Sequence, residues 1–133
     1  MIFTGINIWA VLVATAAGFA TGGIWYGVLG KPWMKAHGFT APMKNASPLP
    51  YIVAVLADFV MAVFLSGLMW HLNAFTLRGG LISGAHAWFG FVITTLAVNN
   101  AFGMRSPKLI LIDGGHWLAV LLVMGAIIGV WGL

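Results

Sequence analysis

Asp58 is the residue best able to do chemistry in this sequence. It is one of only two acidic residues in the 133-residue chain, and it lies inside a long apolar stretch. An ionised carboxylate at the centre of a bilayer costs from about 2.5 kcal/mol to well over 10 kcal/mol, so such a group faces protein or water and usually has a partner. Ala54, Ala62 and Ser66 share its row at four-residue spacing, so Asp58 should point into the bundle. The position predicts either a carboxylate that carries protons or binds a cation, or a structural hydrogen-bond anchor.

Further polar residues occur in the last two apolar stretches. Asp113 and His116 are three residues apart, which places them on one face of a helix. An imidazole there could take a proton from water and exchange it with Asp58. The alternative is a pair of helix-end residues wetted by headgroup water, and the helix dipole favours this alternative for Asp113. Asn99 and the neighbouring Asn100 are expected to join helices by hydrogen bonds rather than to contact a substrate.

Four polar side chains are expected at a comparable depth in the membrane, and we group them as one candidate transport cluster. We expect the cluster to open toward the cytoplasm and to have large apolar residues around it. Its members are Asp58, His116, Asn99 and Tyr26.

The sequence offers little support for a cofactor, a metal or an enzyme. His71 and His86 belong to the opposite leaflet and could ligate haem, but no supporting motif accompanies them. Glycine-rich phosphate loops, His-Glu-x-x-His and paired carboxylates are absent, and the chain has no cysteine. We therefore expect no catalytic site, no metal and no cofactor.

The elements that must position these residues are membrane-spanning helices. Hydrophobic residues make up 62% of the chain and charged residues 6%, whereas a soluble domain carries about 25% charged residues. A spanning helix needs roughly 20 apolar residues. The fold class predicted is a single all-α, polytopic domain over residues 1–133, with four transmembrane helices at about 6–29, 50–72, 80–102 and 110–133.

The first connection is the only long one, and it mixes lysines with aromatic residues. This composition suits a short interfacial segment on the lipid headgroups, with one or two helical turns from Pro32 to His37. Lys31, Lys35, Trp25 and Trp33 are the predicted interfacial anchors.

The distribution of basic residues predicts the orientation of the chain. Loops rich in Lys and Arg stay in the cytoplasm. Loops one and three should therefore be cytoplasmic and both termini outside, in a bacterial cytoplasmic (inner) membrane. The few basic residues form no stripe of the kind that binds nucleic acid, so we expect no nucleic-acid partner. Loops one and three carry Lys31, Lys35, Lys44, Arg105 and Lys108, against Arg78 on the opposite side.

Small residues at four-residue spacing indicate where helices pack closely, because close backbone approach drives helix association in lipid. Gly18 and Gly22 form such a row in the first span, and Gly125 and Gly129 form one in the last. The rows predict packing within one chain. The alternative is a seam between copies along Gly125 and Gly129.

Two segments resemble a known family of small bacterial membrane proteins. Residues 23–34 (GIWYGVLGKPWM) with residues 36–39 (AHGF) resemble its first-span motif. Asp113 with residues 114–116 (GGH), followed by residues 123–131 (VMGAIIGVW), resembles its last span. The family is called domain of unknown function 1761. The resemblance implies a four-span integral membrane protein and leaves the activity open.

Two functions remain for this sequence. The first is a homo-oligomeric membrane protein that moves an ion, protons or a small solute through the cluster around Asp58. The second is a non-catalytic accessory or scaffold subunit of a larger membrane complex, in which Asp58 is structural. An enzyme acting on a lipid or quinone would need a nucleophile or metal site that the motifs do not provide.

Overall fold

The computed structural model describes residues 5–39 and 47–133, and Lys44 of the predicted interfacial segment lies outside them. All regular structure in the described residues is helical, and four continuous stretches are long and apolar enough to cross a membrane. The all-α, four-span prediction is confirmed. The elements are α1 (Ile8–His37), α2 (Leu49–Leu72), α3 (Leu77–Ala87), the π-helical turn η1 (Trp88–Val92), α4 (Ile93–Phe102) and α5 (Pro107–Trp131).

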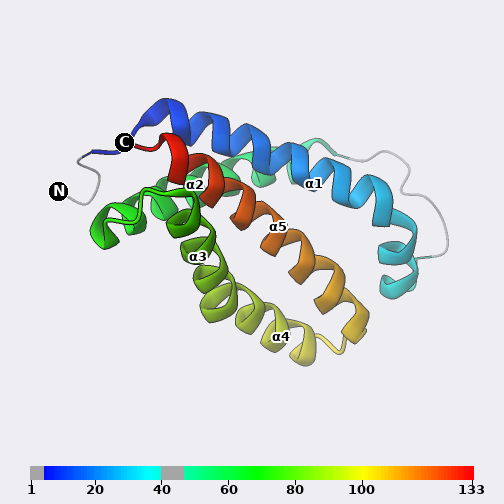
Figure 1. Cartoon of the computed structure of the whole chain (residues 1–133). Coiled ribbons are helices and arrows are strands. Elements are labelled where there is room, and N and C mark those ends of the chain that lie inside the picture. The colour runs from blue at the N-terminus through cyan, green and yellow to red at the C-terminus, as the bar shows by residue number, and fades with distance from the viewer. Residues whose placement is uncertain (1–4, 40–46) are drawn as a thin grey trace.

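Helix α5 is the centre of the structure. It lies between α1 on one side and α3 with α4 on the other (Figure 1). Asn7 caps the start of α1 and also donates from Nδ2 to the Trp131 carbonyl at 3.0 Å, which ties the beginning of α1 to the end of α5. The core consists of buried apolar residues from α1, α2 and α5: Val11, Ala14, Ala62, Leu65, Met69, Val120, Leu121, Met124 and Ile128.

Glycines bring α3 and α5 into backbone contact. A methyl group on Gly125 would overlap with the carbonyl of Gly80, and one on Gly80 would overlap with the carbonyl of Gly125. Gly129 faces the Thr76 carbonyl in the same tight way. The row of Gly125 and Gly129 therefore packs against α3 of its own chain, so it is not free to form the alternative seam between copies.

Helix α1 is longer than the sequence suggested. We expected the first span to end near Leu29, with a separate interfacial turn after Pro32, but the helix continues to His37. Proline removes one intrahelical hydrogen bond and bends a helix without having to end it. The end of α1 changes direction (Figure 1), and Gly38, at φ 77°, terminates the helix.

The third span contains a π-helical turn that the sequence did not predict. It begins at Leu77 rather than near residue 80 and is helical to Phe102, but η1 interrupts the α-helical pattern. A π turn adds one residue to a helical turn, so every later side chain is shifted around the helix axis. The Trp88 side chain at the start of η1 points to α5, where its Nε1 donates to the Gly114 carbonyl at 2.7 Å.

The backbone contact of α3 with α5 predicts the effect of one added methyl group. Gly125→Ala should lower the free energy of unfolding by about 1–3 kcal/mol, because the backbones must separate to relieve the overlap. Gly30→Ala is the matched control: nothing lies near its added methyl group, and alanine favours a helix over glycine. Unfolding in mixed detergent and dodecyl sulfate micelles measures both, and equal midpoints for the two variants would contradict the packing.

Candidate functional site

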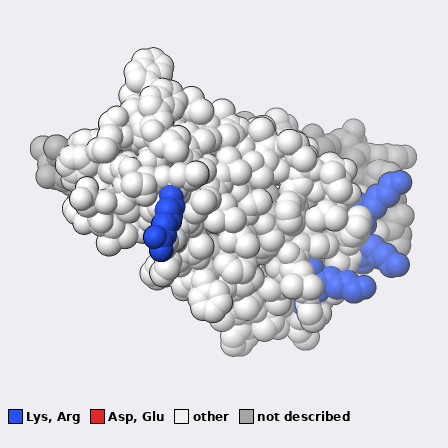
Figure 2. All heavy atoms as spheres, viewed as in Figure 1, with Lys and Arg blue, Asp and Glu red and all other residues white. Residues whose placement is uncertain are grey.

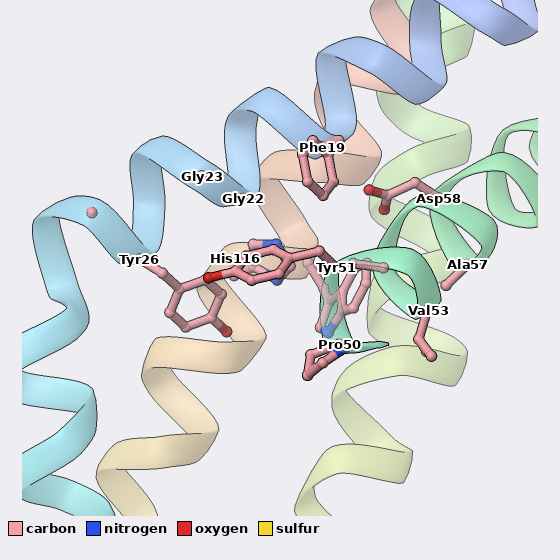
Figure 3. A pocket seen from close by; sticks show the side chains of 13 residues that line it. Phe19, Gly22, Gly23, Tyr26, Pro50, Tyr51, Val53, Ala57, Asp58 and His116 are labelled. Atoms are coloured by element: carbon pink, nitrogen blue, oxygen red, sulfur yellow. The ribbon is translucent and has the colours of Figure 1, made fainter. Parts of the chain in front are cut away.

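A pocket of about 690 Å³ lies between α1, α2 and α5. Asp58 from α2 and His116 from α5 reach it, and Figure 3 shows both side chains at its wall. Most of the remaining lining is apolar or aromatic. The aromatic lining residues are Phe19, Tyr26, Tyr51 and Trp117.

The Asp58 carboxyl is buried but lacks a hydrogen-bond partner in the described part of the chain. Its row on α2 continues into the core through Ala62 and Ser66, which are both buried, as the small-residue spacing predicted. Gly18 of α1 lies beside this carboxyl: a Cβ there would be at an ordinary contact distance of 3.7 Å from the Asp58 Cγ, whereas it would come within 2.6 Å of the Met124 Cε of α5. Asp58 thus faces the pocket as an acid that no protein group of the described residues neutralises.

Packing, rather than hydrogen bonding, positions the His116 ring. The ring centroid lies 4.9 Å from that of Tyr26 and 4.4 Å from that of Trp117. Its Nδ1 is buried without a partner among the described residues. A Cβ on Gly22 would come within 2.9 Å of Nε2, so a glycine is needed there for the imidazole to stay in place. Both ring nitrogens therefore remain unused by the described protein groups.

Asp113 has a role that the sequence did not suggest. Its Oδ1 accepts hydrogen bonds from the Tyr26 hydroxyl and, at 3.1 Å, from Trp33 Nε1. Both donors come from α1, so this carboxyl joins α1 to α5. The expectation of a wetted helix-end acid did not include these two donors, which bond one oxygen of a carboxyl that stays half-buried.

The residues on either side of Asp113 also accept aromatic donors. Trp25 Nε1 donates to the Ile112 carbonyl at 2.9 Å, and Trp88 Nε1 donates to the Gly114 carbonyl at 2.7 Å. Gly115 makes room for the Trp25 ring, whose Cζ2 would lie 2.7 Å from an added Cβ. We call Ile112, Asp113 and Gly114 the α5 junction.

Trp25 and Trp33 of α1 also donate hydrogen bonds to the α5 junction. We expected Trp25 and Trp33 to anchor the chain in lipid headgroups, but their indole N–H groups donate to α5. Lys31 and Lys35, the other predicted anchors, are exposed on the last turns of α1.

Asn99 does not join the cluster. It is exposed on α4 and does not line the pocket, whereas the neighbouring Asn100 is buried and donates from Nδ2 to the Leu96 carbonyl at 2.7 Å. Depth alone suggested Asn99, but α4 packs on α5 and not on α1 or α2, so its side chains lie away from a pocket between α1, α2 and α5. Tyr26, Asp58 and His116, by contrast, do line one pocket.

The two remaining histidines of the sequence analysis stay apart from the pocket. His71 and His86 are exposed, and Nδ1 of His86 lies 2.9 Å from the Ile82 carbonyl of its own helix. Within residues 5–39 and 47–133, no three potential metal ligands of the His, Cys, Asp or Glu type come together.

Fold and pocket define a small four-helix membrane protein with a half-open, mainly apolar site that contains one free acid. The chain belongs to the family described as protein of unknown function DUF1761, whose model matches residues 9–129. The resemblance found in the first and last spans is thereby confirmed. Comparison of the chain with curated proteins and with solved structures found no match in either.

The hydrogen bonds of the α5 junction predict a loss of stability in one conservative variant. Tyr26→Phe removes the hydroxyl that donates to Asp113 and should lower the free energy of unfolding by about 0.6 kcal/mol, and by no more than about 1.7 kcal/mol. Tyr51→Phe is the control, because the Tyr51 hydroxyl makes no hydrogen bond to the described residues. Unfolding in mixed micelles measures both variants. If both have wild-type stability, the hydrogen bond from Tyr26 to Asp113 in the α5 junction is contradicted.

Proposed function

We propose that the protein moves an ion, protons or a small solute across the membrane, with Asp58 as the central group of the path. One observation carries the proposal: Asp58 is buried, faces a pocket and has no hydrogen-bond partner among the described residues. A buried acid with no structural partner is hard to explain as a packing element, because an unsatisfied carboxyl in the membrane is destabilising. A passing proton or cation would supply the missing partner.

The make-up of the pocket favours a positively charged cargo. Aromatic faces attract cations, and this attraction grows where water is excluded. Tyr26, Tyr51 and Trp117 provide such faces in the same pocket as the Asp58 carboxyl. His116 adds a second group that can accept and release a proton, and its two ring nitrogens have no other use in the described part of the chain.

A complete path calls for more than one copy of the chain. The pocket is bounded by α1, α2 and α5, so a single chain offers one half-open site. Large apolar side chains are exposed along α2, among them Val53, Leu56, Val60 and Phe64, and they provide surface for a second copy. A homo-oligomer is therefore part of the proposal.

The proposed setting is a bacterial cytoplasmic membrane, with both termini outside and loops one and three inside. The basic residues support it, because four of them lie where α1 ends and α5 begins. Lys31 and Lys35 are in the last turns of α1, Arg105 directly precedes α5, and Lys108 is in its first turn. In this orientation the pocket, near the middle of α1 and the first half of α5, lies closer to the cytoplasmic side.

Removing the charge of Asp58 tests the path directly. Asp58→Asn should reduce flux into proteoliposomes to the level of empty liposomes while leaving the oligomer intact, because the amide can neither bind a proton nor balance a cation. Protons, K⁺ and ethidium serve as the probes. Ser66→Ala, on the same helix but away from the pocket, is the control. Unchanged flux in Asp58→Asn would refute the proposal, as would a wild-type protein that moves none of the probes.

Filling the pocket should also stop flux. Ala54 lines the pocket, whereas Val55, its neighbour on α2, is exposed and does not. Ala54→Phe should therefore abolish most of the flux of the organic cation, and Val55→Phe should leave it close to the wild-type value. Equal flux in the two variants, measured with ethidium in proteoliposomes, would place the path elsewhere.

A second candidate function, the non-catalytic accessory subunit, draws support from the third span. Only 11% of its most apolar window is buried within the chain, against 28–33% for the other spans. Phe89 and Phe91 of η1 and Phe102 of α4 are strongly exposed and offer a surface for a partner. Co-purification at fixed stoichiometry with another membrane protein would favour this function, and under either candidate we propose that the chain is not an enzyme.

A further inference from the structure

A second hollow, of about 610 Å³, lies between the last turns of α1 and the first turns of α5. Lys31 and Lys35 come from α1, and Ser106 and Lys108 come from α5. Figure 2 shows basic side chains gathered at this end of the molecule, where α1 ends and α5 begins. Pro32, Ala36 and Ile112 complete the lining and give the hollow an apolar part.

No acid of the described residues is ion-paired with these lysines. The sequence contains two acidic residues: Asp58, which faces the other pocket, and Asp113, whose Oδ1 accepts from Tyr26 and Trp33. The described residues contain no ion pair between Lys or Arg and either acid. Three lysines thus line one hollow, and none of them forms an ion pair within the described part of the protein.

The α5 junction fixes the two sides of the hollow relative to each other. Ile112 belongs both to the junction and to the lining, and Trp33, which donates to Asp113, lies between Lys31 and Lys35 in the sequence. The lysine stems are therefore anchored on two helices whose spacing is set before any ligand arrives. A site held in this way loses less conformational freedom on binding than lysines on a mobile loop.

We propose that this hollow binds the phosphate group of an anionic phospholipid. Lysine is a compact cation that suits a phosphate oxygen, and the Ser106 hydroxyl can donate to the same group. The hollow lies where α1 ends and α5 begins, and both helices are long and apolar enough to cross a membrane, so we infer that it lies at headgroup level. Basic pockets between helices recognise anionic headgroups. Its apolar part suits the start of the acyl chains, which a free phosphate ion does not have.

The test uses the full chain in a neutral detergent, titrated with dioleoylphosphatidylglycerol and followed by native mass spectrometry. Replacing two lysines, as Lys35→Gln with Lys108→Gln, should weaken binding of this lipid about 30-fold, since each lysine near an anionic surface contributes about fivefold. Arg78→Gln, which removes a charge outside the hollow, should bind the lipid as the wild type does. The charge-preserving pair Lys35→Arg with Lys108→Arg should also bind it, which separates loss of the site from loss of the fold.

Four results would overturn the proposal. They are unchanged phosphatidylglycerol binding in the glutamine pair, an equal loss in Arg78→Gln, equal wild-type affinity for dioleoylphosphatidylcholine, and displacement of the lipid by millimolar inorganic phosphate. The last of these would identify a free anion as the occupant. Lipid binding is measured without any flux through the Asp58 pocket, so the failure of one proposal is distinguishable from the failure of the other.

Discussion

Polar groups inside a membrane must find their hydrogen-bond partners within the protein, because lipid offers none. For four aromatic side chains of this protein one short segment meets the requirement, the α5 junction of residues 112–114, where they donate to two backbone carbonyls and one carboxylate oxygen. Three of the donors come from α1 and one from the start of η1. The first and third spans are thereby attached to the same turn of α5, and glycines allow the close approach. The donors are Trp25, Tyr26, Trp33 and Trp88.

The two acidic residues have different roles, and the α5 junction engages only one of them. Asp113 is occupied by Tyr26 and Trp33, so it holds helices together. Asp58 has no such partner among the described residues and faces a pocket whose shape the junction helps to set, because Tyr26 bonds to Asp113 and also packs against His116. The structural acid and the free acid are therefore linked through one tyrosine. That link gives a mainly apolar bundle a defined site, and it also holds the end of α1 beside the start of α5, where the lysines lie.

Hydropathy and small-residue spacing were enough to predict the four spans, because length and apolar composition determine what can cross a bilayer. They also placed Asp58 on the inward row of α2, since Ala62 and Ser66 mark that row. The role of Asp113 could not be predicted, because it depends on aromatic side chains that reach over from another helix. Asn99 was assigned to the cluster by depth alone, but it is exposed on α4, which packs on α5 and not on the two other helices that form the pocket. Pro32 suggested a helix end and produced only a bend, because the helix continues past the one hydrogen bond that proline removes.

Carbodiimide labelling tests the central claim most directly, which is that Asp58 is free and reachable while Asp113 is engaged. The chain has no other side-chain carboxyl, so peptide mapping by mass spectrometry assigns each label without ambiguity. The protein in native membrane vesicles would be treated with dicyclohexylcarbodiimide, an apolar reagent that attacks protonated carboxyls. The account predicts rapid labelling of Asp58, little labelling of Asp113, and an increase at Asp113 in the Tyr26→Phe variant. Labelling of Asp113 but not of Asp58 in the wild-type protein would contradict it.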